Sequence, residues 1–185
     1  MLFFLTLLYG LLVLSLLIFE LIFFGSSFYS SWLGAPYVPV NKRISRELFT
    51  LLPREGRGLF VDLGSGDGRV LRGAVAAGFK GAVGYELAWW PYFLSGVLNR
   101  WYNVGERVEV IRRSLLSADI SKADVVYAYL MPKMMDKVLP KLQKELLPGA
   151  RFVTCLFQLR NYENSFVLVA SEPMGNKRIY IYRKL

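Results

Sequence analysis

The chain has 185 residues, of which 54% are hydrophobic and 20% are charged, which is enough apolar material for one ordinary folded domain. It carries a formal net charge of +9, a single cysteine (Cys155) and no histidine. These counts exclude a disulfide framework, a Cys/His zinc site and every mechanism that uses histidine as its base, so no metal site is expected.

The first segment predicts a membrane anchor. Residues 1–24 contain 20 apolar side chains. As a helix, residues 2–24 would span about 34 Å, against a hydrocarbon core of about 30 Å. A cleaved signal peptide is the alternative, and it fits less well because no Lys or Arg precedes the run, the run is too long, and no A-x-A site follows it. We therefore expect the chain to enter the membrane through residues 2–24.

Charge predicts how this anchor is oriented. All 23 Lys and Arg residues follow residue 41. The positive-inside rule then predicts a single-pass protein whose folded domain is cytoplasmic, and the lack of an Arg/Ser-rich leader favours a prokaryotic plasma membrane. The basic charge also predicts attraction to an anionic lipid surface, whereas no nucleic-acid motif is present and no nucleic-acid partner is expected. The predicted divisions are an anchor (1–25), a linker (26–40) and a folded domain (41–185).

Beyond the linker, segments of helical and strand character alternate. Helices are expected over residues 41–52, 69–77, 89–101 and 133–147. Pro140 should kink or interrupt the last of these helices. Strands are expected over residues 58–63, 82–86, 107–111, 123–129, 150–157, 165–170 and 178–183. This order predicts an α/β fold with a mostly parallel sheet, helices on both of its faces and a C-terminal antiparallel pair of strands.

The chemistry is concentrated where the first strand passes into a helix, in the run Val61-Asp62-Leu63-Gly64-Ser65-Gly66-Asp67-Gly68-Arg69. In open parallel sheets, ligands bind at the carboxyl ends of the strands. The glycines let the backbone approach a ligand, and the N-terminus of the next helix offers unpaired N–H groups. Glu86 ends the second strand, 22 residues after Gly64, where a carboxylate can accept hydrogen bonds from ribose hydroxyls.

Two cofactors fit these features. The dinucleotide motif G-x-G-x-x-G would need its third glycine at position 69, which is Arg69. The observed D-x-G-x-G-x-G instead resembles the first motif of class I S-adenosylmethionine-dependent methyltransferases. The segments PYVP, FKGAVGYEL and DVVYAYLMP are similar to one group of these enzymes. That group is the membrane-anchored protein-lysine methyltransferases of the ATP synthase c subunit and adenine nucleotide translocase type, with their bacterial relatives. The resemblance covers roughly residues 36–157.

The resemblance implies a Rossmann-like class I methyltransferase with S-adenosylmethionine as donor and a lysine of a membrane protein as a possible acceptor. By motif position it implies donor contacts from Asp62, Gly64, Ser65, Gly66, Asp67, Gly68, Glu86, Leu87 and Ser114. Asp67 would either hold a loop amide or contact the amino group of the donor, and Leu87 would lie against the adenine. The acceptor channel would lie near Tyr129 and Pro132; the structural alternatives are a strand-end aromatic residue and a proline that starts a helix.

Two segments depart from the family pattern. Ser114 stands where the family usually has an acidic residue near the adenine, although a hydroxyl can still accept a bond from the adenine amino group. Residues 158–162 lack the tryptophan that related sequences often have there. Two other functions therefore stay open: methylation of a lipid, quinone or other small membrane-soluble acceptor, and a donor-binding scaffold without catalysis. Methyl transfer itself agrees with the composition, because it needs orientation and a dry path rather than a histidine.

Overall fold

One mixed sheet forms the centre of the folded domain. The computed structural model describes residues 1–32, 47–175 and 177–185. Its elements are α1 (Leu2–Trp32), β1 (Leu59–Leu63), α3 (Arg69–Ala76), β2 (Gly81–Tyr85), α4 (Trp89–Trp101), η1 (Gly105–Arg107), β3 (Val108–Ile111), η2 (Leu115–Ser117), β4 (Val125–Ala128), α5 (Pro132–Glu145), β5 (Arg151–Cys155), β6 (Phe166–Met174) and β7 (Lys177–Lys184). The strand order is β3-β2-β1-β4-β5-β7-β6. Strands β1 to β5 pair in parallel and β7 pairs antiparallel with both β5 and β6, which confirms the predicted fold class.

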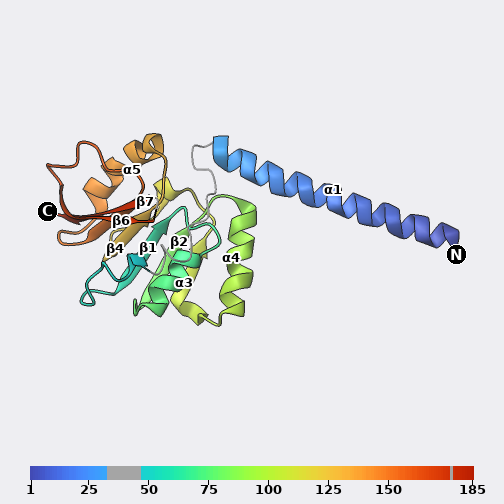
Figure 1. Cartoon of the computed structure of the whole chain (residues 1–185), viewed down its shortest axis with the longest axis horizontal. Helices are drawn as coiled ribbons and strands as arrows, with labels where there is room; N and C mark the ends of the chain where they lie inside the picture. The colour runs from blue at the N-terminus through green and yellow to red at the C-terminus, as the bar shows by residue number, and fades with distance from the viewer. Residues whose placement is uncertain (33–46, 176) are drawn as a thin grey trace.

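The core lies on both faces of this sheet, because alternate residues of a strand point to opposite sides. On one face, Phe60 and Tyr127 pack with α3 and with the buried residues of the segment 47–52. On the other face, Val61 and Val126 pack with the buried side of α5. Helices therefore cover both faces, and the carboxyl ends of the parallel strands are left at one edge (Figure 1).

Helix α1 extends away from the domain (Figure 1). Its stretch Leu2–Leu21 has a mean hydropathy of 2.7 and is long and apolar enough to cross a membrane, and none of it is buried within the protein. A core helix would be mostly buried, whereas a membrane span or a signal sequence would look like this one. The helix continues to Trp32, past residue 25, where the anchor was predicted to end.

A network around one arginine holds the segment before β1 against α3. Only part of the helix predicted over 41–52 lies within the described residues, and there Glu47 and Leu48 are helical. The guanidinium of Arg57 donates to the carbonyls of Phe49 (2.9 Å) and Leu52 (3.0 Å), and also to the carbonyl of Ala77 at the end of α3. One side chain thus satisfies carbonyls from two segments, which fixes the segment 47–52 over the same face of the sheet as α3.

Helix α5 differs from the prediction at Pro140, which neither interrupts nor ends it. Proline lacks an N–H and leaves the carbonyl four residues earlier, that of Asp136, without its helical partner. Both Pro140 and Asp136 are exposed, so water can satisfy that carbonyl. The buried residues Val138 and Leu142 keep the helix packed against the sheet on either side of the proline.

Candidate active site

The turn between β1 and α3 adopts a backbone that only glycine accommodates easily. Gly64, Gly66 and Gly68 have φ angles of 91°, 55° and 76°. The N–H groups of Gly64 and Ser65 both donate to the carbonyl of Tyr85 at the end of β2, at 2.9 and 3.1 Å. The turn is therefore fastened to the neighbouring strand, and Gly68 leads directly into α3 as its N-cap.

A glycine in β2 makes room for this turn. A Cβ at Gly84 would lie 2.5 Å from Ser65 Oγ and 2.6 Å from Leu71 Cδ1. Ser65 is buried, and its hydroxyl has no hydrogen-bond partner among the described residues. Buried hydroxyls are normally paired, so an unpaired one at the carboxyl edge of a parallel sheet fits a site built for a polar ligand.

Glu86 connects the two strand ends. Its carboxylate accepts hydrogen bonds from the N–H of Gly66 (2.9 Å, to Oε2) and the N–H of Ala88 (2.7 Å, to Oε1). The side chain is 8% exposed, and burial raises its pKa from the usual glutamate value, although the backbone N–H groups of Ala88, Gly66 and Leu87 oppose that shift. Glu86 thus shapes the glycine turn, and its carboxylate lies where ribose hydroxyls are expected. Leu87 follows it and is half-buried.

Asp67 is held within the loop. It accepts from the backbone N–H of Arg69 (3.1 Å) and from the guanidinium of Arg69 (2.7 Å to Nη2). Burial alone would raise the pKa of Asp67, but the hydrogen bonds and charge of Arg69 outweigh it, so the pKa is lowered. Of the two roles predicted for Asp67, this contact corresponds to holding a loop amide.

Asp62 is the carboxyl of the site whose ionised form is most disfavoured by its surroundings. It lies in β1, is 2% exposed, and its pKa lies well above the usual aspartate value, first because of burial and then because of the charges of Glu86 and Asp67. Three carboxylates thus meet at one edge of the sheet. A bound cation would relieve their mutual repulsion, so the site is suited to a positively charged ligand.

The end of β4 lies beside the glycine turn. A Cβ built on Gly64 would contact Leu130 at 3.6 Å, which places the segment after β4 against that glycine. The hydroxyl of Tyr129 accepts a hydrogen bond from Lys177 Nζ at 3.0 Å, and the same nitrogen lies 4.4 Å from the centroid of the Tyr129 ring. Pro132 takes the first position of α5, the place where a proline starts a helix.

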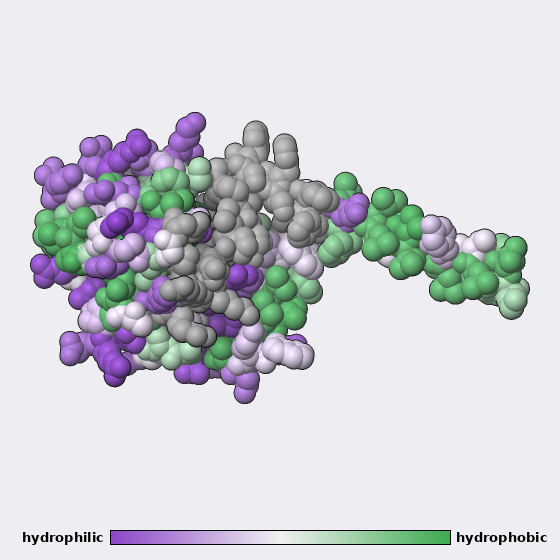
Figure 2. All heavy atoms as spheres, viewed as in Figure 1, coloured by the Kyte–Doolittle hydropathy of each residue, from purple (hydrophilic) through white to green (hydrophobic). Residues whose placement is uncertain are grey.

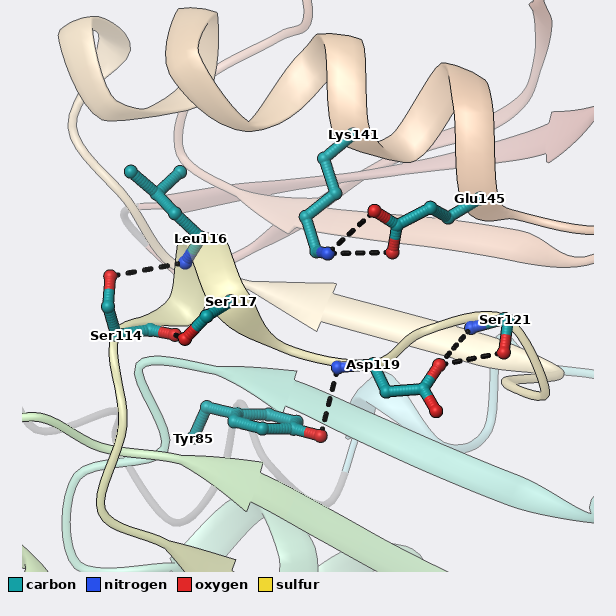
Figure 3. A network of polar contacts seen from close by, with 8 residues as sticks. All are labelled: Tyr85, Ser114, Leu116, Ser117, Asp119, Ser121, Lys141 and Glu145. Carbon is teal, nitrogen blue, oxygen red and sulfur yellow. Dashed lines mark hydrogen bonds and ion pairs between the residues drawn. The ribbon is translucent and has the colours of Figure 1, made fainter.

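The segment after β3 also lies at the carboxyl edge of the sheet. Ser114 is half-buried and caps η2 with its hydroxyl, which accepts from the N–H of Leu116 at 3.3 Å. Figure 3 shows Tyr85 pointing from β2 to this segment, where its hydroxyl accepts from the N–H of Asp119 at 3.0 Å. Because the carbonyl of Tyr85 also holds the glycine turn, this one residue connects the two backbone segments on either side of the proposed adenine position.

We expect Tyr85→Phe to lower the free energy of unfolding by about 1 kcal/mol, because the N–H of Asp119 loses its partner. It should also weaken donor binding, because the segment that carries Ser114 is less well held. Tyr182→Phe is the matched control, since the Tyr182 hydroxyl accepts from the N–H of Leu159 at the same 3.0 Å elsewhere in the fold. Urea denaturation should show a similar loss for both variants. Calorimetric titration with S-adenosylmethionine, the donor that the sequence resemblance implies, should show weaker binding for Tyr85→Phe alone.

Three residues that shape the candidate site are not among the site residues predicted from the sequence. Arg69 could have been found from its position two residues after Asp67, at the start of a helix. Gly84 could have been suspected as a glycine inside a predicted strand, where it marks a close approach of another segment. Lys177 had no local signal, because it reaches Tyr129 across 48 positions of the chain.

The comparisons with known proteins agree with this geometry. The family model of the ANTKMT methyltransferase domain matches residues 62–165. The chain is 30% identical over 149 residues to a protein-lysine N-methyltransferase of Saccharolobus islandicus, over 80% of this chain and 92% of the relative. It is 34% identical over 127 residues to the lysine N-methyltransferase of the ATP synthase c subunit from Xenopus laevis, over 69% of this chain but only 55% of that relative.

Among solved structures, an RNA methyltransferase from Salinibacter ruber in complex with S-adenosyl-L-homocysteine has a TM-score of 0.73 and 26% identity, covering 80% of this chain and 94% of that one. S-Adenosyl-L-homocysteine is what remains of the donor once its methyl group has left. With the glycine turn, the Glu86 carboxylate that holds it and the acidic surroundings of Asp62, these matches show that the chain belongs to the ANTKMT methyltransferase domain family, as a class I methyltransferase whose methyl donor is S-adenosylmethionine.

Proposed function

We propose that the chain is a membrane-anchored protein-lysine N-methyltransferase that acts on a lysine of a membrane protein. Two relatives, at 30% and 34% identity, are named as lysine N-methyltransferases, one of them for the c subunit of ATP synthase. The proposal takes α1 as a single-pass anchor and the domain as cytoplasmic, which the basic charge of the domain supports. An anchored enzyme meets membrane-bound acceptors at a raised effective concentration.

The contact between Tyr129 and Lys177 carries this proposal. Here a lysine amine already lies 3.0 Å from a tyrosine hydroxyl and 4.4 Å from the centre of its ring, directly after β4. A hydroxyl and an aromatic face are both favourable neighbours for an ammonium group. An incoming lysine could replace Lys177 at Tyr129, beside Leu130, which itself lies against Gly64 of the donor turn.

The protein's share of the reaction is orientation. When bound, S-adenosylmethionine supplies a methyl group on a positively charged sulfur that needs no further activation. Glu86 would hold the ribose, the turn from Gly64 to Gly68 would lie against the donor's methionine part, and Asp62 would face its positive charge. The Tyr129 hydroxyl would accept from the lysine amine and aim its nitrogen at the methyl carbon. The lysine must first lose a proton to water, which apolar surroundings favour because they lower the pKa of an amine.

The test uses the full chain in detergent or vesicles, methyl-labelled S-adenosylmethionine and host membranes stripped of their own enzyme. We expect label in the protein fraction, recovered as methyl-lysine after hydrolysis, and no label with Glu86→Ala. Tyr129→Phe should reduce transfer up to about tenfold while donor affinity is kept, since the hydrogen bond that orients the neutral acceptor amine is lost. Tyr180→Phe, on β7 and also half-buried, is the matched control and should transfer normally.

Other distributions of the label would contradict the proposal. Label in the lipid extract, and none in protein, would replace it with methylation of a lipid, quinone or other small membrane-soluble acceptor. Equal transfer by Tyr129→Phe and Tyr180→Phe would remove Tyr129 from the acceptor site and leave the donor site intact.

A further inference from the structure

Helix α4 fully buries none of its large apolar side chains. Its buried residues are Pro91 and Ser95, and Asn99 faces α3, where its Oδ1 accepts from Arg72 Nη1 at 2.9 Å. Surface helices normally bury their apolar stripe and expose their polar one. The two fully buried residues of α4 are thus small, Trp90, Tyr92, Leu94 and Leu98 are half-buried, and the other large apolar side chains are left exposed.

Those apolar residues form an exposed stripe. Trp89, Phe93, Val97 and Trp101 recur at every fourth position, and their exposed fractions are 44%, 48%, 50% and 83%. Residues four apart lie on one side of a helix, and the rings of Trp89 and Phe93 stack at 5.4 Å. Tyr102, the next residue of the chain, is 57% exposed. A contiguous exposed stripe of this kind marks an interaction surface rather than scattered surface hydrophobics.

The position of the stripe relative to α1 indicates what covers it. The ring of Phe19 in α1 packs edge to face on the ring of Trp90 in α4, with 5.3 Å between the centroids. Phe19 lies two residues before Leu21, where the apolar stretch of α1 ends. Figure 1 shows α4 on the side of the domain nearest α1, running across the direction of α1. In the same view, Figure 2 shows apolar surface on that side of the domain. If α1 crosses a bilayer, α4 therefore lies along the membrane surface, at the depth where the span ends.

We propose that the exposed stripe of α4 lies in the headgroup region of the bilayer and holds the domain against the membrane as a second contact beside α1. This inference rests on the proposed anchoring by α1. Tryptophan and tyrosine favour the membrane interface, and a helix with one apolar side lies in that plane. Arg100 is exposed beside Trp101, and Arg107 is exposed after α4, where both can meet anionic headgroups.

The proposal has a consequence for the active site. Helix α4 begins three residues after Glu86, so the carboxyl edge of the sheet lies next to the first turn of the stripe. A stripe held at the membrane surface keeps this edge at a fixed, shallow height above the bilayer. Acceptor lysines just outside the hydrocarbon region are then within reach, and those on distant soluble domains are not.

The experiment places a nitroxide label on single-cysteine variants of the full chain, in a Cys155→Ala background, reconstituted in vesicles of phosphatidylethanolamine and phosphatidylglycerol. Val97→Cys probes the stripe. Val169→Cys is the matched control, because Val169 is 48% exposed on β6, the far edge strand of the sheet. Leu12→Cys, in the middle of the apolar stretch, tests the anchor separately. Collisions with lipid-soluble oxygen and with a water-soluble nickel chelate are measured at each label.

We expect the label at position 97 to be several-fold less accessible to the nickel chelate, and several-fold more accessible to oxygen, than the label at position 169. Equal accessibility at both positions, with the label at position 12 inside the lipid, would overturn the stripe contact and leave the anchor standing. A label at position 12 in water would instead overturn the anchoring on which the inference rests. Spin–spin broadening at position 97 that grows with protein density would show that the stripe contacts a second copy of the chain, and would overturn the bilayer contact.

Discussion

Replacing Glu86 by alanine should reduce the affinity for S-adenosylmethionine by about a hundredfold and stop methyl transfer at ordinary donor concentrations. The carboxylate holds the N–H groups of Gly66 and Ala88, so its removal both loosens the glycine turn and deletes the expected ribose contact. Hydrogen bonds to a charged group contribute about 1.5–3 kcal/mol each, and about 1.4 kcal/mol corresponds to a factor of ten in affinity. Calorimetric titration of the purified full chain with the donor measures the loss directly.

Two further variants separate the role of the charge from that of the fold. Glu86→Gln keeps the size of the side chain and one acceptor oxygen, so its affinity should fall between that of Glu86→Ala and the natural protein. Glu145→Ala removes a carboxylate of α5 that pairs with Lys141 at 2.6 Å, away from the site, and donor binding should not change. Donor affinity within twofold of the natural protein for Glu86→Ala would remove Glu86 from the donor site.

The glycine turn and the position of Glu86, which form the expected donor site, could be predicted from sequence because their geometry is local. Gly64, Gly66 and Gly68 adopt positive φ angles inside one turn, and the spacing of those glycines in the sequence already requires such a turn. Glu86 was placed by a second local rule, since a residue that ends the neighbouring parallel strand must lie at the same edge as the turn. A strand, a glycine turn and a helix in succession leave little freedom for any other arrangement.

The proposed acceptor side depends on contacts between distant segments, which could not be predicted in the same way. Lys177 reaches Tyr129 because β7 pairs antiparallel with β5, which itself pairs with β4, and no spacing in the sequence specifies this strand order. The exposed stripe of α4 could not be predicted from sequence either, because tryptophans at the start of a helix suggest core packing until their burial is known. At Pro140 the local rule was applied too strongly, since an exposed helix side tolerates the loss of one hydrogen bond to water.

Asp62→Asn should change stability and donor binding in opposite directions. Burial, and then the charges of Glu86 and Asp67, hold the pKa of Asp62 well above its usual value in the donor-free protein. A raised pKa in the folded state means that stability present at low pH is lost as the pH rises through that pKa. The neutral asparagine avoids this loss, so at neutral pH the donor-free variant should have the higher free energy of unfolding. The donor, however, carries positive charge, so its affinity should fall about tenfold or more when the carboxylate is gone.

The pH dependence separates this explanation from simple repacking. The stability advantage of Asp62→Asn should disappear below the usual aspartate pKa, where Asp62 is protonated in both the folded and the unfolded natural protein. Asp119→Asn is a control of opposite sign, because hydrogen bonds from Ser121 lower the pKa of the exposed Asp119. Its carboxylate contributes stability above the usual aspartate pKa that is lost as the pH falls, so Asp119→Asn should be slightly less stable at neutral pH. Urea denaturation from acidic to neutral pH measures both variants. If the stability gained by Asp62→Asn is constant over this pH range, Asp62 is not a buried carboxylate repelled by its neighbours. If the substitution leaves donor affinity unchanged, Asp62 does not face the donor's positive charge.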